Sequence, residues 1–133
     1  MNDVPANSSQ SDSVVSEIKS LGRNAFTYSA DISNASEVNS LVEASVSELG
    51  PLNTMVANAG IAQVKPLLDL TEQDFKRMFE VNVYGVFNCY SAAARQMIKQ
   101  GNGGKILGAA RYVLSIFCIQ AYYLGRGIRR SHP

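Results

Sequence analysis

Two stretches of the chain carry hydrophobic residues at the spacing of an amphipathic helix until a glycine ends the pattern. The first follows the serine-rich residues 5–13 and ends at Gly22; its apolar positions are Val14, Val15, Ile18 and Leu21. The second begins with Ser33 or Ser36 as its N-cap and ends at Gly50; its stripe comprises Val38, Leu41, Val42, Ser45, Val46 and Leu49. The pattern therefore predicts two short helices that each cover a core with one face.

A third and longer helix is expected from Glu72 to about Gln100. Thr71, with Asp74 three positions later, forms a capping-box variant at its start, and the glycines of residues 101–104 end it. Asn82 lies among β-branched residues in the middle of this helix, and we expect the helix to bend there.

Runs of β-forming residues at 25–30, 52–57 and 105–109 separate the helices and predict three strands. The order helix, strand, helix, strand, helix, strand favours the α/β class, with an open parallel sheet and right-handed crossovers. Ligands of such sheets bind outside the carboxyl ends of the strands. Asp31 follows the first strand and Asn58, Ala59 and Gly60 follow the second, so these residues are candidates for a binding site.

Composition narrows the classes of partner. A chain of 133 residues has room for one domain, and its formal net charge of +1 provides no electrostatic footprint for nucleic acid. Cys89 and Cys118 lie far apart without metal-ligand spacing, so no metal site is expected. The N-terminus lacks a signal-peptide pattern, and the apolar segment 112–124 is too short to cross a bilayer. We expect a cytoplasmic protein without nucleic-acid or membrane partners.

Four motifs in this order resemble the short-chain dehydrogenase/reductase family of NAD(P)-dependent oxidoreductases with a Rossmann fold. They are Asp31-Ile32, the segment Ala57 to Gly60, Asn82 within EVNVYGV (80–86), and the start of the strand at GGKI (103–106). The resemblance runs from about Asp3 to Ala110 and implies a partial Rossmann fold that lacks the first strand and its Gly-rich loop. The expected domains are residues 1–110, an incomplete NAD(P)-binding domain, and residues 111–133, an aberrant tail without firm packing.

The resemblance also implies roles for single residues. Asp31, with Ile32 beside it, would accept a hydrogen bond from the adenine amino group, although a strand-end aspartate that caps the next helix is an equal alternative. Asn58, Ala59 and Gly60 would stabilise the sheet and lie against the adenosine, where a plain turn is the alternative. Asp3 would bond the adenosine ribose, which favours NAD over NADP as the cofactor.

Asn82 is similar to the family's catalytic asparagine, which bends its helix and holds a water of the proton relay with its main-chain carbonyl. An asparagine that only bends the helix is the alternative, and both interpretations require the same bend.

The family's serine, tyrosine and lysine are not found where its pattern places them. The serine position falls at or beside Arg111, and the sequence contains no lysine beyond Lys105. Tyr122 and Arg126 imitate the tyrosine-to-lysine spacing, but a guanidinium would not present the same point charge beneath a phenol. One choice of synonymous codons for Ile116 to Ala121, read from the second base, encodes Tyr-Ser-Ala-Ser-Lys. This peptide is a common form of the family's tyrosine-to-lysine motif. We therefore hypothesise that residues 111–133 are translated out of frame, from a transcript that also begins downstream of the true start.

The expected function is that of an NAD(P)-dependent oxidoreductase that interconverts small ketones and alcohols, with diacetyl and acetoin as candidates. This chain would be a catalytically inactive fragment of such an enzyme. The alternative is a non-catalytic fragment that associates with full-length relatives as a homo- or hetero-oligomer. The long helix would supply that contact through Tyr84, Phe87, Tyr90 and Met97; covering the sheet of its own domain is the competing role for these residues.

Overall fold

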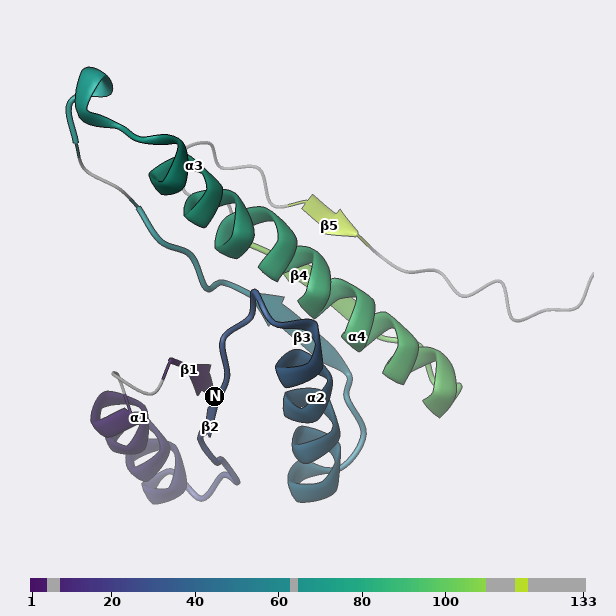
Figure 1. Cartoon of the computed structure of the whole chain (residues 1–133). Coiled ribbons are helices and arrows are strands. Elements are labelled where there is room, and N and C mark those ends of the chain that lie inside the picture. Colours follow the sequence, from purple (N-terminus) through teal and green to yellow (C-terminus); the bar gives the residue numbers. More distant parts are fainter. Residues whose placement is uncertain (5–7, 63–64, 110–116, 120–133) are drawn as a thin grey trace, which may run out of the picture.

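The structure is a computed structural model that describes residues 1–4, 8–62, 65–109 and 117–119. One long helical rod crosses the molecule, with shorter helices and strands beneath it (Figure 1). The described elements, in chain order, are β1 (Asn2–Asp3), α1 (Ser8–Ser20), β2 (Tyr28–Ser29), α2 (Ala35–Leu49), β3 (Thr54–Ala57), η2 (Leu67–Asp69), α3 (Glu72–Phe79), η3 (Glu80–Gly85), α4 (Val86–Gln100), β4 (Lys105–Gly108) and β5 (Phe117–Ile119).

The strands form two separate groups. β1 pairs with β2 in parallel, and β3 pairs with β4 in parallel through the registers Thr54↔Lys105 to Ala57↔Gly108. β5 adds to the second group antiparallel to β4. The parallel strands separated by helices confirm the α/β class and the partial Rossmann fold.

The core lies where α2 and η3–α4 cover β3 and β4. One buried cluster joins Ile32 to both helices and to the end of β3; its members are Ile32, Val38, Val42, Ala57, Val81, Cys89 and Ala92. A second cluster at the far end of α4 contains Ala93, Met97 and Ile106. Buried apolar surface of this kind is the main source of stability in a domain of this size.

The long helix begins as predicted. Thr71 Oγ1 accepts a hydrogen bond from the Asp74 backbone N–H at 3.1 Å, and Asp74 Oδ2 accepts from the Thr71 backbone N–H at 3.0 Å, so the capping box is complete. Around Asn82, where we expect a bend, the structure has the π-helical segment η3. Gly101 ends α4 in the left-handed region, with φ of 75°.

Three expectations about local structure were wrong. The N-cap of α2 is Asn34, whose side chain accepts from the Ser36 backbone N–H, and neither Ser33 nor Ser36 caps the helix. A strand, β1, precedes the first helix, because the Tyr28 backbone N–H bonds to the Met1 carbonyl and the Ala30 N–H to the Asp3 carbonyl. Met97 is buried, so it cannot belong to an exposed contact face of the long helix.

The tail expectation falls largely outside the described residues. Within it, Phe117–Ile119 forms β5. No helix in the described part of the chain is long and apolar enough to cross a membrane.

Candidate functional site

Asn82 connects the long helix to the loop that follows β3. Its Oδ1 accepts a hydrogen bond from the Ile61 backbone N–H at 2.8 Å, and its Nδ2 donates to the Ile61 carbonyl at 2.8 Å. The two bonds use both ends of the side-chain amide, so they fix its orientation. A Cβ on Gly60 would lie 3.2 Å from Asn82 Oδ1, which is a tight contact. Glycine at position 60 therefore allows the loop to lie close to η3.

The loop itself begins where β3 ends. Ala57 is buried in the core, whereas Asn58, Ala59 and Gly60 are all exposed. Small exposed residues at the carboxyl end of a parallel strand leave room for a ligand to approach the backbone. The structure thus places all three predicted residues at the expected edge of the sheet. Asn82 is held beside them by its two hydrogen bonds to the Ile61 backbone.

Asp31 has fixed partners at the carboxyl end of β2. Its Oδ1 accepts from the Ser33 backbone N–H at 2.9 Å and from Ser33 Oγ at 2.7 Å, and its Oδ2 accepts from Arg77 Nη2 at 3.1 Å. The two bonds from Ser33 are the largest cause that lowers the pKa of the Asp31 carboxyl, and the Arg77 guanidinium lowers it further. A carboxylate offers about four acceptor positions. Three are used, which leaves one on Oδ2 for a donor such as an exocyclic amine.

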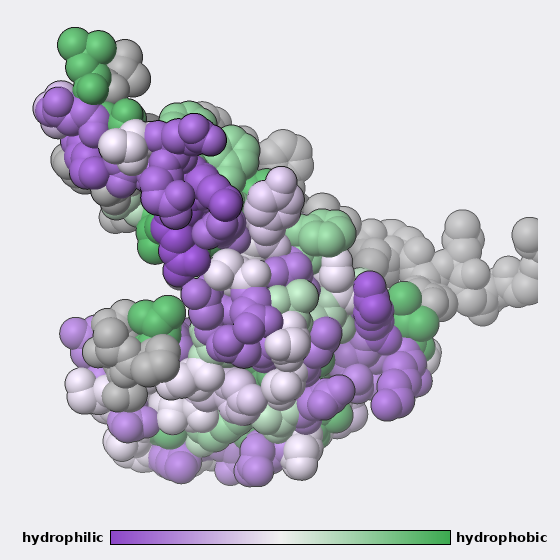
Figure 2. All heavy atoms as spheres, viewed as in Figure 1, coloured by the Kyte–Doolittle hydropathy of each residue, from purple (hydrophilic) through white to green (hydrophobic). Residues whose placement is uncertain are grey.

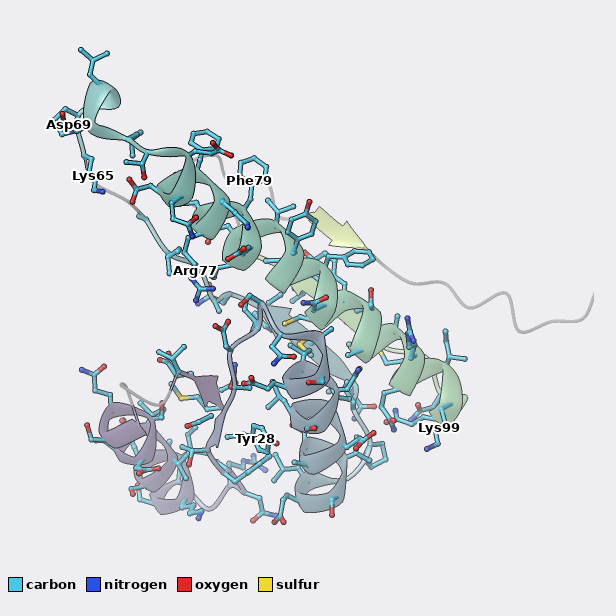
Figure 3. The ribbon with its side chains drawn as sticks, viewed as in Figure 1. Tyr28, Lys65, Asp69, Arg77, Phe79 and Lys99 are labelled. Carbon is cyan, nitrogen blue, oxygen red and sulfur yellow. The ribbon has the colours of Figure 1, made fainter. Side chains whose placement is uncertain are left out.

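Arg77 is the residue of this site that the sequence analysis missed. It extends from α3 toward the loop after β2 (Figure 3), where Nη1 also contacts Ser33 Oγ at 3.2 Å and Glu80 at 3.6 Å. The bond to Asp31 is the main reason that the pKa of Arg77 is raised. No local pattern pairs residues 31 and 77. The one sequence feature that could have drawn attention to Arg77 is that it is a basic residue five positions before Asn82.

One helix therefore ties together the ends of two strands. Arg77 bonds the residue that follows β2, and Asn82 bonds the loop that follows β3. In the same view the surface is hollowed between the polar face of α3 and the lobe that contains α1 (Figure 2).

Two other predicted residues have different surroundings. The Ile32 side chain is buried in the core, where a Cβ on Gly85 would come within 2.7 Å of it, and the Ile32 carbonyl accepts from Asn88 Nδ2 at 3.0 Å. Asp3 ends β1, and its Oδ1 accepts from the Val4 backbone N–H at 2.7 Å. Ile32 is thus a packing residue, whereas Asp3 lies at a strand end.

The described residues present little further chemistry. They contain no cluster of three or more acidic, histidine or cysteine side chains that could hold a metal ion. Burial raises the pKa of the Cys89 thiol, which disfavours the reactive thiolate. Tyr122 and Arg126 lie outside the described residues.

Comparison with known proteins points to one family. The family described as short chain dehydrogenase matches residues 4–110. A short-chain dehydrogenase/reductase of Armillaria gallica is 42% identical over 109 residues, covering 82% of this chain and 42% of the relative. The diacetyl reductase [(S)-acetoin forming] of Staphylococcus epidermidis is 41% identical over 93 residues, covering 70% of this chain and 36% of that enzyme.

Solved structures agree with the sequence comparisons. A 7α-hydroxysteroid dehydrogenase complexed with NADH and 7-oxo glycochenodeoxycholic acid superposes with a TM-score of 0.73 at 36% identity, over 82% of this chain and 41% of that one. A short chain dehydrogenase from Burkholderia cenocepacia in complex with NADP gives a TM-score of 0.71 at 31% identity, over 80% and 42% of the two chains. The chain spans less than half the length of each of these relatives.

Proposed function

Because this chain belongs to the short-chain dehydrogenase/reductase family, we propose that it forms the adenosine-binding part of an NAD(P)-dependent ketone/alcohol oxidoreductase and is not itself catalytically active. The observation that carries the proposal is the joint placement of Asp31 and the Asn58–Gly60 loop, through Arg77 and Asn82 on one helix. A cytoplasmic location and small carbonyl or alcohol substrates belong to the same proposal. Diacetyl and acetoin are the first candidates, since the relatives include diacetyl reductases.

The described residues fit one side of a dinucleotide. Asp31 would accept the adenine amino group at the remaining position of Oδ2, and Asn58, Ala59 and Gly60 would lie against the adenosine. Asp3, at the end of β1, would bond a ribose hydroxyl and favour NAD over NADP. When bound, the nicotinamide would supply hydride transfer.

The remaining parts of the site lack counterparts in this sequence. No glycine-rich turn precedes α1 to receive a pyrophosphate, and no lysine follows Lys105. Asn82 is retained in its π-helical segment, a type of helix distortion that occurs frequently at functional sites. For residues 1–133 taken alone we therefore propose weak nucleotide binding without turnover.

Adenosine recognition is tested with AMP, followed by NMR chemical shifts of the Ser33 and Ile61 amides. Asp31→Asn should weaken AMP binding about tenfold, because a charged acceptor for the amine is lost. Asp69→Asn, at an exposed carboxylate of η2, is the control and should leave the affinity unchanged. The proposal fails if AMP shifts neither amide in the unsubstituted protein.

Catalytic inactivity needs a separate assay. NADH absorbance is followed with diacetyl as substrate, and the expected result is no oxidation above the rate without protein. Protein-dependent oxidation would contradict the proposal of an inactive fragment. Sequencing the cDNA across codons 105–125 tests the out-of-frame tail, which is wrong if the shifted frame lacks the tyrosine and lysine codons.

A second function, association with full-length relatives, is favoured by an apolar stripe on the long helix. Its members are all about half exposed or more: Phe75, Phe79, Val83, Tyr84 and Phe87. A surface hollow of about 470 Å³ lies along it, lined by Glu72, Phe75, Lys76, Phe79, Glu80 and Tyr84. A contiguous exposed apolar surface of this kind marks a protein contact more often than chance exposure does. The contact surface would thus extend along the long helix from Phe75 to Phe87.

Co-purification with a tagged full-length relative tests this association. Phe87→Asp should abolish it, because a charge would enter the apolar contact, whereas Leu21→Asp, at an exposed leucine after α1, should not. Equal recovery of the two variants would exclude the stripe as the contact surface.

A further inference from the structure

The turn between α4 and β4 holds the one Asn-Gly pair of the sequence, Asn102-Gly103. Every other asparagine is followed by a residue with a side chain. The turn lies at the end of the helical rod farthest from η2 (Figure 1), and it belongs to neither a helix nor a strand, since α4 ends at Gln100 and β4 begins at Lys105. Asn102 is exposed. Water and base therefore reach this pair in the folded protein.

The backbone N–H of Gly103 is open to reaction. Among the described residues, no oxygen accepts a hydrogen bond from it, whereas the Gly101 N–H donates to the Met97 and Ile98 carbonyls. Gly103 has no Cβ beside its nitrogen, and its φ of 71° is a conformation that glycine adopts without strain. The nitrogen that follows Asn102 in the chain is thus neither paired within the described residues nor shielded by a side chain.

The side-chain amide of Asn102 has a donor directed at its oxygen. Gln100 Nε2 donates to Asn102 Oδ1 at 3.2 Å and to the Leu52 carbonyl at 3.0 Å. Gln100 Oε1 in turn accepts from the Leu52 N–H at 2.8 Å, so the orientation of the Gln100 amide is fixed. A hydrogen bond to a carbonyl oxygen stabilises the negative charge that develops there when a nucleophile attacks the carbon. Gln100 therefore activates the Asn102 amide toward attack.

We propose that Asn102 is a site of intramolecular deamidation in the folded protein. The Gly103 nitrogen bonds to the side-chain carbonyl carbon of Asn102, the bond from that carbon to the amide nitrogen breaks, and ammonia leaves with the proton of the Gly103 N–H. Water then adds to either carbonyl of the resulting succinimide and returns a proton to the Gly103 nitrogen. Opening at the side-chain carbonyl gives aspartate, and opening at the main-chain carbonyl gives isoaspartate. Water is the only co-reactant, and the inference does not depend on nucleotide binding.

Either product changes the surroundings of Gln100. Leu52 packs against both buried clusters, so its two bonds to Gln100 tie the end of α4 to the chain ahead of β3. Both products place a carboxylate beyond the C-terminus of α4, where the helix dipole disfavours negative charge. Isoaspartate also adds a methylene group to the main chain between α4 and β4, which displaces the acceptor of Gln100. The modification therefore weakens the link between α4 and Leu52.

The test is peptide mapping of the full chain after incubation in mildly alkaline buffer, where the Gly103 nitrogen loses its proton more readily. Trypsin cleaves after Lys99 and Lys105, which releases residues 100–105, and mass spectrometry with fragmentation follows the conversion of Asn102. The rate in the folded protein should lie within about tenfold of the rate in a synthetic peptide of residues 99–105. A rate lower than this, or conversion confined to other asparagines, overturns the proposal.

Two glycines of the turn supply a matched pair of variants. Gly103→Ala and Gly101→Ala both place alanine at positive φ, 71° and 75°, with no atom within 4 Å of the added Cβ, so they carry similar strain. Gly103→Ala should slow the conversion about tenfold, because the new methyl group shields the attacking nitrogen, whereas Gly101→Ala should leave the rate unchanged. Equal rates in the two variants overturn the proposal. If circular dichroism shows that either variant is unfolded, the comparison of the unsubstituted chain with the peptide decides.

The effect on Gln100 is measured by hydrogen exchange of the Leu52 amide. Exchange should become faster in the converted protein, and Gly103→Ala incubated for the same time should keep the original rate. An unchanged Leu52 exchange rate after full conversion would contradict the weakened link between α4 and Leu52.

Discussion

The two ends of the molecule are built from similar elements but bury very different amounts of apolar surface. In the part formed by α2, β3, α4 and β4, two clusters fill the space between helices and strands. In the part formed by β1, α1 and β2, the strands have two residues each. Among the described residues of α1, Val15 is the one apolar side chain that is buried. Among the described residues, both clusters lie where helices cover the four-residue strands β3 and β4, and neither contains a residue of α1.

The largest expected effect tests this difference directly. Met97→Ala should lower the free energy of unfolding by about 2–5 kcal/mol, because Met97 is buried between Ala93 and Ile106. Val15→Ala on α1 should cost about 1 kcal/mol, since Val15 belongs to neither cluster and the substitution removes a smaller group. Urea unfolding followed by circular dichroism gives both values. A cost for Val15→Ala that equals that of Met97→Ala would remove the distinction between the two parts.

Close packing beside β4 gives the next largest effect. A Cβ on Gly108 would collide with the Tyr90 hydroxyl, so Gly108→Ala should cost about 1–3 kcal/mol. Adding Tyr90→Phe removes the hydroxyl and should recover part of that loss. Thermal unfolding of the single and double variants measures the recovery, and its absence would mean that the collision is not the cause.

Asn82 lies at the border of the well-packed part, and its loss should have a smaller effect. Asn82→Ala removes both bonds to Ile61 and should cost about 1–2 kcal/mol. Faster exchange of the Ile61 amide should accompany it. Asn88→Ala, which removes the bond from α4 to the Ile32 carbonyl, is the control and should leave the Ile61 amide unchanged.

The smallest effect concerns the link between the loop after β2 and α3. Because the folded-state pKa of Asp31 is lowered, its contribution to stability is complete above about pH 4 and is lost as the pH falls through the lowered pKa. After allowance for solvent screening the contribution is about 0.5 kcal/mol. Ser33→Ala should raise the pKa of Asp31 more than Arg77→Met does, which carbon-13 NMR of the carboxyl measures. The reverse order would make Arg77 the dominant partner.

Local sequence signals predicted the helices and the longer strands well. The capping box at Thr71 and the glycine after Gln100 are short-range features, and the structure contains both. The cap of α2 and the strand β1 were missed for different reasons. Asn34 lies between two serines that are equally good caps by type, and β1 exists only through its pairing with β2, which no local pattern indicates.

The site was predictable where its residues follow strands. Asp31 and the loop at Asn58 lie at carboxyl ends as expected, because parallel strands end at a common edge. Arg77 could not be found this way, since its bond to Asp31 spans 46 residues and depends on the direction of α3. The Ile32 side chain, in the turn after β2, is buried in the core, and its predicted place beside the adenine stays a prediction.

The π-helical segment also determines the phase of the long helix. Phe75, Phe79, Val83 and Phe87 are spaced by four residues, and in a continuous α-helix of about 3.6 residues per turn such a row drifts around the axis. The i→i+5 bonds of η3 place more residues in one turn, which rotates the row back. Removing one residue between Glu80 and Gly85 would restore the narrower turn and rotate α4 relative to α3. The direction of the apolar stripe and the contact of Asn82 with the Ile61 backbone therefore both depend on the π-helical segment.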